Sequence, residues 1–375
     1  MSKISNVKVL VNAYSSHIGG GRTVVLNFLK TISGADHNHD IHVLTRADHD
    51  FVDACKAQGF KTLVPPRIFE NAFGITILYI VLLPLYLLIR RYCTLLNFAD
   101  IPIMFHGKQI MYYDWPWALY RNSYAWSLLT GQEKLLKRTR LCIFGIFARF
   151  VDIWLVQTNV VKERLLALGV KGKFVLTPNS TTVVTTNSSS KWINSSLPPG
   201  SKYGLCLTSY YVHKNIEILI KVALLLKARG AKIVFVTTLD RQSTGYFELY
   251  NSIHMNMVSE HFVNLGHVNL EDIPNLYRRV DFMILPTLLE TYTGTYVEAG
   301  TYGCPILTSD LDFSREICGD SATFFDPLDA SSINGAIDKI LLNDNYRNSV
   351  VAKAKERFHT SVKWEEISST IVNQL

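Results

Sequence analysis

The chain has 375 residues, 48% hydrophobic and 18% charged, and Lys and Arg outnumber Asp and Glu by 38 to 31. This composition excludes a disordered protein, and the length predicts two domains, each with its own core. The net charge of +7 favours anionic ligands or an anionic surface. The six cysteines form no C-x-x-C pair, which favours buried thiols in a reducing compartment.

Short apolar runs alternate with amphipathic segments in the first half of the chain, a pattern typical of a parallel α/β sheet. No charged leader followed by an apolar signal core opens the sequence, so we expect a cytoplasmic protein. Helices are expected over 23–32, 133–149 and 159–168. Strands are expected over 7–12, 41–44, 101–105, 109–113 and 153–157.

Residues 73–89 are almost wholly apolar, contain Pro84, and end at Arg90 and Arg91. Spanning a bilayer takes about 20 apolar residues, so a span, a buried helix and a helix at the membrane surface all stay open. The basic helix expected over 133–149 is open in a similar way. This helix could lie against the anionic inner face of the cytoplasmic membrane. Alternatively, it could bury its apolar side in the core with its charges in water.

Residues 179–202 are rich in Ser, Thr, Asn, Pro and Gly, which cannot supply a core. The alternation then restarts, so we predict an α/β fold with two Rossmann-like, doubly wound parallel-sheet domains facing a central cleft. In the second half, strands are expected over 204–208, 232–237, 263–265, 282–285 and 305–308, and helices over 217–229, 273–280, 296–302, 331–342, 346–358 and 364–372. The predicted divisions are an N-terminal domain (1–185), a linker (186–202), a C-terminal domain (203–357) and a last helical segment that could pack back on the N-terminal domain (358–375).

Three glycines, Gly19, Gly20 and Gly21, follow the first expected strand and precede a helix. Glycine lets the backbone approach a phosphate closely, and a helix amino terminus offers free N–H groups. A tight turn without a ligand is the alternative. The spacing departs from G-x-G-x-x-G, which argues against a nicotinamide dinucleotide.

Lys214 follows the first expected strand of the second domain. An ammonium group at a strand end could neutralise a departing diphosphate, and Asn215 could cap the next helix. An exposed loop lysine is the alternative interpretation.

Two carboxylates, Glu290 and Glu298, lie on either side of Gly294, after the strand expected over 282–285. If Gly294 opens the next helix, Glu290 lies on the preceding loop and Glu298 in the first turns. Ionised carboxylates accept hydrogen bonds from vicinal diols, so one could reach a sugar and the other a ribose. A chance pair of glutamates is the alternative.

The glycine triplet, Lys214 and the pair of glutamates follow one another along the chain in the order of a known family. Gly266 in the stretch 265–268, and Pro178 and Asn179, also fall in that order. On them the sequence resembles the retaining GT-B glycosyltransferases of family 4, the glycosyltransferase group 1 type. The resemblance implies transfer of a hexose from a nucleotide-diphosphate sugar, and we expect a glycan acceptor in surface polysaccharide biosynthesis such as that of lipopolysaccharide. The apolar segment 73–89 and the basic helix are what favour a lipid-linked glycan acceptor. It also implies a retained anomeric configuration and no metal or other cofactor.

The resemblance further implies an acceptor-side N-terminal domain and a C-terminal domain that binds the nucleotide-sugar. The donor site would also include Gly266, and Gly20 and Gly21 would meet the diphosphate from the opposite wall. The remaining implied roles are Lys214 on the diphosphate, Glu298 on the ribose, and Glu290 with the backbone near Thr293, Gly294 and Thr295 around the transferred sugar.

The sequence departs from the family pattern at two positions. Many members have an arginine where this chain has Ser209, and many have a histidine where it has Asp114. Asp114 is therefore a candidate for contact with the acceptor or the donor sugar, and its catalytic role stays open. A nucleotide-sugar epimerase and a non-catalytic, membrane-associated nucleotide-sugar-binding protein are the alternative functions. Neither a nucleic-acid partner nor a metal site is expected, since the loose cluster of histidines lacks ligand spacing: His37, His39, His42 and His49.

Overall fold

The computed structural model describes residues 7–16, 19–34, 39–180, 195–359 and 362–375. The chain divides into two compact units. The N-terminal unit comprises Met1–Arg121, Thr130–Asn179 and Val362–Leu375, and the C-terminal unit comprises Asn122–Leu129 and Ser180–Ser361. Residues 186–194 of the expected linker and His37 lie outside the described residues.

The N-terminal unit is built on a seven-stranded sheet in the order β3-β2-β1-β4-β5-β6-β7, in which all pairs are parallel. Inner strands such as β4 and β6 are continuous buried runs, because helices cover both faces of such a sheet. The strand order reverses between β1 and β4, so the loops after these strands diverge at a switch point. The strands are β1 (Val7–Asn12), β2 (His39–Leu44), β3 (Lys61–Leu63), β4 (Thr94–Asn97), β5 (Lys108–Tyr112), β6 (Ile153–Val156) and β7 (Lys173–Leu176).

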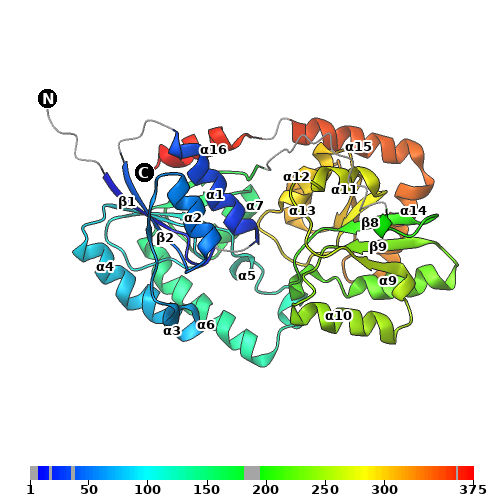
Figure 1. The fold of residues 1–375 in the computed structure, drawn as a ribbon, viewed down its shortest axis with the longest axis horizontal. Helices are drawn as coiled ribbons and strands as arrows, with labels where there is room; N and C mark the ends of the chain where they lie inside the picture. The colour runs from blue at the N-terminus through cyan, green and yellow to red at the C-terminus, as the bar shows by residue number, and fades with distance from the viewer. Residues whose placement is uncertain (1–6, 17–18, 35–38, 181–194, 360–361) are drawn as a thin grey trace. The chain divides into compact units, whose positions relative to one another are not determined.

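The last helix of the chain belongs to this unit. Trp364, Ile367 and Ile371 of α16 (Trp364–Val372) are buried in the same core as Phe28 of α1. Figure 1 shows α16, in red, beside α1, in blue. The other helices are α1 (Gly19–Ser33), α2 (His49–Ala57), η1 (Arg67–Glu70), α3 (Ala72–Ile77), η2 (Leu78–Leu82), α4 (Leu83–Ile89), α5 (Pro116–Leu119), α6 (Gly131–Phe147), η4 (Ala148–Phe150) and α7 (Asn159–Ala167).

The strand expected over 101–105 is wrong, and β4 lies just before it. Residues 101–105 are described but form no strand, because the Gln109 side chain takes over the backbone groups of Ile103. Gln109 Oε1 accepts from the Ile103 N–H at 3.0 Å, and its Nε2 donates to the Ile103 carbonyl at 2.8 Å. Pro102, which has no N–H to donate, also disfavours a ladder here.

Residues 73–89 fold as a helical segment of three parts, α3, the π-helical turn η2, and α4. Within the described part of the chain, no helix is long and apolar enough to cross a membrane. The segment buries one side against its own unit, through Leu78, Leu83 and Leu87. The segment is therefore buried on one side and exposed on the other, and its contact with a membrane stays a prediction.

The C-terminal unit contains a six-stranded sheet in the order β10-β9-β8-β11-β12-β13, again parallel throughout. Its order reverses between β8 and β11, the second switch point of the chain. The strands are β8 (Lys202–Cys206), β9 (Ile233–Thr237), β10 (Phe262–Asn264), β11 (Phe282–Leu285), β12 (Ile306–Ser309) and β13 (Thr323–Phe325). The helices are η3 (Tyr124–Trp126), η5 (Val212–Lys214), α9 (Ile218–Ala228), α10 (Thr244–Met255), η6 (Ser259–His261), α11 (Ile273–Arg279), α12 (Gly294–Thr301), α13 (Asp312–Cys318), α14 (Ala330–Leu342) and α15 (Asp344–His359).

Candidate functional site

Two loops at the switch point of the C-terminal unit bring the predicted basic and acidic residues together. Lys214 ends η5 in the loop after β8, and Glu290 lies in the loop between β11 and α12. Because β8 and β11 are hydrogen-bonded neighbours, the loops at their carboxyl ends start side by side. Ligands of open parallel sheets bind at this position.

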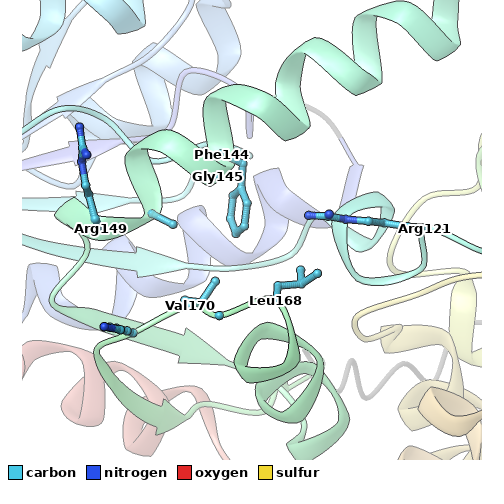
Figure 2. A pocket seen from close by; sticks show the side chains of 9 residues that line it. Arg121, Phe144, Gly145, Arg149, Leu168 and Val170 are labelled. Carbon is cyan, nitrogen blue, oxygen red and sulfur yellow. The ribbon is translucent and has the colours of Figure 1, made fainter.

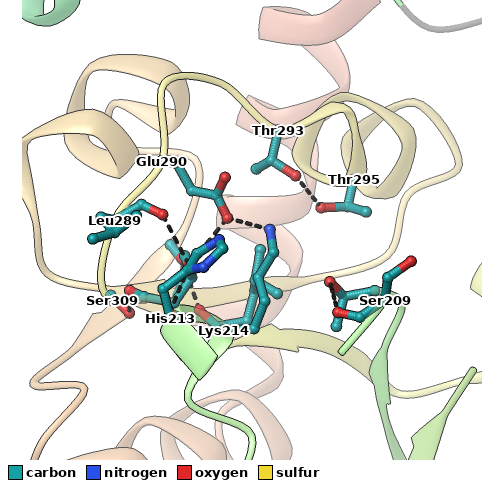
Figure 3. A network of polar contacts seen from close by, with 12 residues as sticks. Ser209, His213, Lys214, Leu289, Glu290, Thr293, Thr295 and Ser309 are labelled. Atoms are coloured by element: carbon teal, nitrogen blue, oxygen red, sulfur yellow. Dashed lines mark hydrogen bonds and ion pairs between the residues drawn. The ribbon is translucent and has the colours of Figure 1, made fainter. Parts of the chain in front are cut away.

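Lys214 and Glu290 form a nearly buried ion pair. The Lys214 Nζ donates to Glu290 Oε1, and the two side chains are only 12% and 9% exposed. Thr287 Oγ1 donates to the same carboxylate oxygen at 3.0 Å. Figure 3 shows the lysine and the glutamate reaching toward each other. A buried pair of this kind needs such extra hydrogen bonds to offset the loss of hydration.

Main-chain contacts fix the two loops to each other. The His213 carbonyl accepts from the Leu288 N–H at 2.8 Å; it also lies 3.2 Å from Thr287 Oγ1, whose single hydrogen can go either to this carbonyl or to Glu290. Ser309 Oγ at the end of β12 donates to the Thr287 carbonyl at 2.7 Å. The position of Lys214 relative to Glu290 therefore follows from the backbone as well as from their own attraction.

Asn215 does not cap the next helix, which corrects the sequence expectation. Its backbone is left-handed, with φ of +54°, and its Nδ2 donates to the carbonyls of Pro286 at 3.2 Å and Pro327 at 2.8 Å. Asparagine tolerates this conformation better than most residues. The side chain thus braces the lysine loop against two other loops, and α9 begins later, at Ile218, without a side-chain cap.

Helix α12 begins at Gly294, two residues before the expected start at 296 and as in the conditional placement of Gly294 at the helix opening, and its amino terminus adjoins the ion pair in the chain. Thr293 makes no side-chain cap to the first turn; its hydroxyl instead lies 2.8 Å from that of Thr295. Figure 3 shows these two hydroxyls facing each other. First-turn N–H groups without a side-chain cap, together with the helix dipole, favour an anion at this end.

Glu298 lies inside α12, also as predicted, but its partner is a residue that the sequence did not point to. Tyr277 of α11 donates from its hydroxyl to Glu298 Oε2 at 3.1 Å. Burial raises the pKa of Glu298 to about 7, an effect that the Tyr277 hydrogen bond partly opposes. The carboxyl group is therefore poised between its neutral and ionised forms near neutral pH.

Gly266 follows β10 and has φ of +73°, a conformation that glycine adopts at little cost. Its N–H donates to Asn264 Oδ1 at 3.3 Å. The turn geometry alone explains a glycine at this position.

Gly20 and Gly21 lie in the first turn of α1, in the N-terminal unit, rather than in a loop before the helix. The helix starts at Gly19, which has φ of +59°. A Cβ atom added at Gly20 would meet nothing within 4 Å, whereas one at Gly21 would lie 3.2 Å from the Ser16 Cβ. Packing in the described structure thus gives no reason for a glycine at position 20.

Asp114 lies between β5 and α5 in the N-terminal unit. Burial, and then the negative charge of Asp100, raise the pKa of Asp114 to about 7. Asp100 is itself paired with Arg140 of α6 at 3.1 Å. Asp114 is thus a carboxyl group that can carry a proton near neutral pH.

A hollow of about 310 Å³ lies elsewhere on the N-terminal unit. Arg121 and Arg149 stand at its sides and Phe144 at its base (Figure 2). None of the predicted site residues lines it. The described residues also contain no group of three or more His, Cys, Asp or Glu side chains arranged to hold a metal ion.

Comparison with known proteins relates the C-terminal part of the chain to sugar transferases. Residues 189–357 match the family model described as Glycosyl transferases group 1. An uncharacterized glycosyltransferase of Methanocaldococcus jannaschii is 26% identical over 163 residues, which cover 43% of this chain. The match spans only 41% of the length of that relative.

Solved structures resemble the chain over almost its whole length. Sucrose-phosphate synthase from Thermosynechococcus elongatus has a TM-score of 0.74 at 15% identity, covering 97% of both chains. HepE of Anabaena, in complex with UDP and glucose, has a TM-score of 0.72 at 14% identity, covering 98% of this chain and 99% of that one. The two parallel-sheet units therefore have the GT-B fold, and within the chain residues 189–357 match the glycosyl transferases group 1 model.

Proposed function

We propose that the chain is a retaining, metal-independent glycosyltransferase that moves a hexose from a nucleotide-diphosphate sugar to a glycan or lipid-linked glycan acceptor, in the synthesis of a surface polysaccharide. The observation that carries the proposal is the Lys214–Glu290 pair at the switch point, next to the amino terminus of α12. The matched domain and the UDP bound by HepE support a nucleotide-sugar as the donor.

In this mechanism, positive charge stabilises the departing nucleotide diphosphate. Lys214 supplies a full positive charge. The backbone N–H groups of Thr293, Gly294 and Thr295 supply the partial positive charge at the amino terminus of α12. A diphosphate that attracts Lys214 would compete with its bond to Glu290. The freed carboxylate could then accept hydrogen bonds from the hydroxyls of the transferred sugar.

The ribose is assigned to Glu298, whose ionised carboxylate can accept from both vicinal hydroxyls. Gly266 is assigned to the part of the donor site that binds the nucleotide. In the N-terminal unit, Gly20 lies in the first turn of α1, where its missing side chain leaves room for a phosphate, and Gly21 continues the same turn. Asp114 is assigned to contact with the acceptor or the transferred sugar.

The proposal is tested by incubating the protein with UDP-, GDP-, ADP- and CMP-linked sugars, with EDTA present, and measuring release of the nucleotide. Release from one donor, lost in Lys214→Ala, is expected. Proton NMR of the product should show the anomeric configuration of the donor. Recovery of an isomerised nucleotide-sugar would indicate an epimerase instead, and tight nucleotide binding without turnover of any donor would indicate a binding protein.

A further inference from the structure

The helical segment formed by α3, η2 and α4 presents a row of large aliphatic side chains to solvent. Leu88 and Ile89 are 73% and 74% exposed, although both are fully apolar. Positions 81, 82, 85, 88 and 89 repeat at three- and four-residue steps, which places them on one side of a helix. We call this side the outer face; its exposed residues are Phe73, Val81, Leu82, Leu85, Leu88 and Ile89.

The opposite side of the segment is firmly packed. Its buried residues Gly74, Leu78, Leu83 and Leu87 follow one another at steps of four, five and four. The π-helical turn over Leu78–Leu82 accommodates the five-residue step, so the buried side stays aligned past the proline in α4. The outer face is therefore held outward by the packing of the inner one.

Close contact at Gly74 shows how tightly the inner side is docked. A Cβ atom added there would lie 2.4 Å from the Ile68 carbonyl oxygen and 2.6 Å from the Phe69 Cα. Only glycine lets α3 approach η1 this closely. The segment cannot roll to bury its outer face without breaking this contact.

The charged residues that directly follow the helical segment are cations, whereas η1 before it carries both Arg67 and Glu70. Residues 71–99 contain no Asp or Glu. Arg67 precedes the segment and Arg90 and Arg91 close it, and all three are exposed. The apolar row thus ends in cations, within a chain whose net charge is +7.

We propose that the outer face lies flat on an anionic phospholipid surface, with its aliphatic side chains between the lipid headgroups and acyl chains and its terminal arginines among the phosphates. An exposed apolar row on one helix flanked by basic residues is the pattern of an interfacial helix. Charge complementarity between the closing arginines and lipid phosphates favours an anionic lipid surface over a protein partner. The proposal goes beyond the transferase activity and does not depend on it.

The basic helix α6 is a weaker candidate for the same role. It also exposes apolar side chains, among them Leu135 and Ile146. Two of its cations are engaged within the protein, however, because Arg140 pairs with Asp100 and the Lys137 Nζ lies 4.1 Å from the centre of the Trp117 ring. These contacts turn part of its positive charge away from a membrane.

The test is co-sedimentation of the full chain with phosphatidylcholine vesicles that contain about one third phosphatidylglycerol. The double variant Leu88→Glu/Ile89→Glu should reduce the bound fraction at least about tenfold, since it removes two apolar contacts and adds two repelling charges. Leu342→Glu, at an 81% exposed leucine of α14, is the matched control and should bind as the wild type does. Circular dichroism and the melting temperature should be unchanged in both.

The arginine pair separates the electrostatic part. Arg90→Glu/Arg91→Glu should weaken binding to these vesicles, as should about 0.5 M salt. Absence of wild-type binding, or equal binding by wild type and Leu88→Glu/Ile89→Glu, would overturn the proposal. The proposal would also be overturned if the α6 variant Leu135→Glu lost binding while the outer-face variant still bound. A dimer seen by light scattering in the wild type and abolished in the outer-face variant would overturn it too.

Discussion

Replacing Glu298 with Gln should make the protein more stable and its donor site weaker at the same time. The amide keeps an oxygen that can accept from Tyr277, so the hydrogen bond at 3.1 Å can be retained. Only the ionisable group is removed. The two effects should have opposite signs. Burying the ionised carboxylate lowers the free energy of unfolding, whereas the same ionised carboxylate accepts hydrogen bonds from the ribose hydroxyls and so strengthens donor binding.

The size of the stability effect follows from the pKa. Burial raises the pKa of Glu298 from 4.5 to about 7, and each pKa unit corresponds to about 1.4 kcal/mol. A carboxyl whose pKa is raised in the folded state stabilises the protein fully below its unfolded pKa, and this contribution is lost as the pH rises through the folded one. Glu298→Gln should therefore match the wild type near pH 4 and exceed its free energy of unfolding by up to about 3 kcal/mol at pH 8.

The assay is urea unfolding at both pH values, with Glu248→Gln as a control at an exposed glutamate of α10. Calorimetric titration of the preferred nucleoside diphosphate gives the second readout, in which Glu298→Gln should bind about tenfold more weakly at pH 8. The affinity of the wild type for the nucleoside diphosphate, relative to that of the variant, should rise about tenfold from pH 6 to pH 8. The reason is that only the ionised Glu298 carboxylate can accept hydrogen bonds from both ribose hydroxyls. A variant no more stable than the wild type at pH 8, with unchanged nucleotide affinity, would refute the reasoning.

Four further substitutions test the other site residues. Lys214→Ala should lower turnover about a hundredfold, more than it lowers nucleoside affinity, and should also lower the melting temperature by leaving Glu290 buried without its cation. Lys214→Ala/Glu290→Gln should regain the melting temperature but not turnover, and normal turnover in either variant would remove the lysine from the mechanism. Asp114→Asn should unfold at higher urea than the wild type at pH 8 but not at pH 4, since its pKa is also raised to about 7, and equal midpoints at pH 8 would contradict this. Gly20→Ala should leave the melting temperature unchanged or slightly raised, because its Cβ meets nothing within 4 Å, while weakening donor binding; unchanged titration curves would remove Gly20 from the site.

Strong apolar periodicity made much of the fold predictable from the sequence. The strands β1 and β11 and the helix α16 lie at the predicted residues. Each combines a clear apolar pattern with polar or glycine-containing flanks. The alternation of strands and helices was enough to predict two parallel sheets.

The misses occur where the local pattern is ambiguous. Strand β4 is only four residues long and lies between the Arg90-Arg91 pair and a second apolar run over 101–105, which has the stronger strand pattern in the sequence. Helix α10 buries only Gly245, Leu249 and Ile253, and the signal that could have located it is the cap Ser243, whose Oγ accepts from Tyr246 N at 3.2 Å. Short elements such as α13 and β13 offer still less pattern.

For the site, the sequence supplied the residue types but not their partners. Gly294 could be placed at a helix start and Glu298 within that helix from spacing alone. The contact of Glu298 with Tyr277 and the brace from Asn215 to Pro327 link residues that are 21 and 112 positions apart. Such pairings depend on the order of strands in the sheet, which a single sequence does not specify.

The most direct test of the central claim is a thermal-shift screen of the wild type and Lys214→Ala against UDP, GDP and ADP, their matching monophosphates, CMP, and the sugar conjugates of these nucleotides, with EDTA throughout. The account predicts that one nucleoside diphosphate and its sugar conjugates raise the melting temperature, that the matching monophosphate does so less, and that Lys214→Ala largely removes the difference. No shift with any of these nucleotides, or a shift that EDTA abolishes, would contradict it.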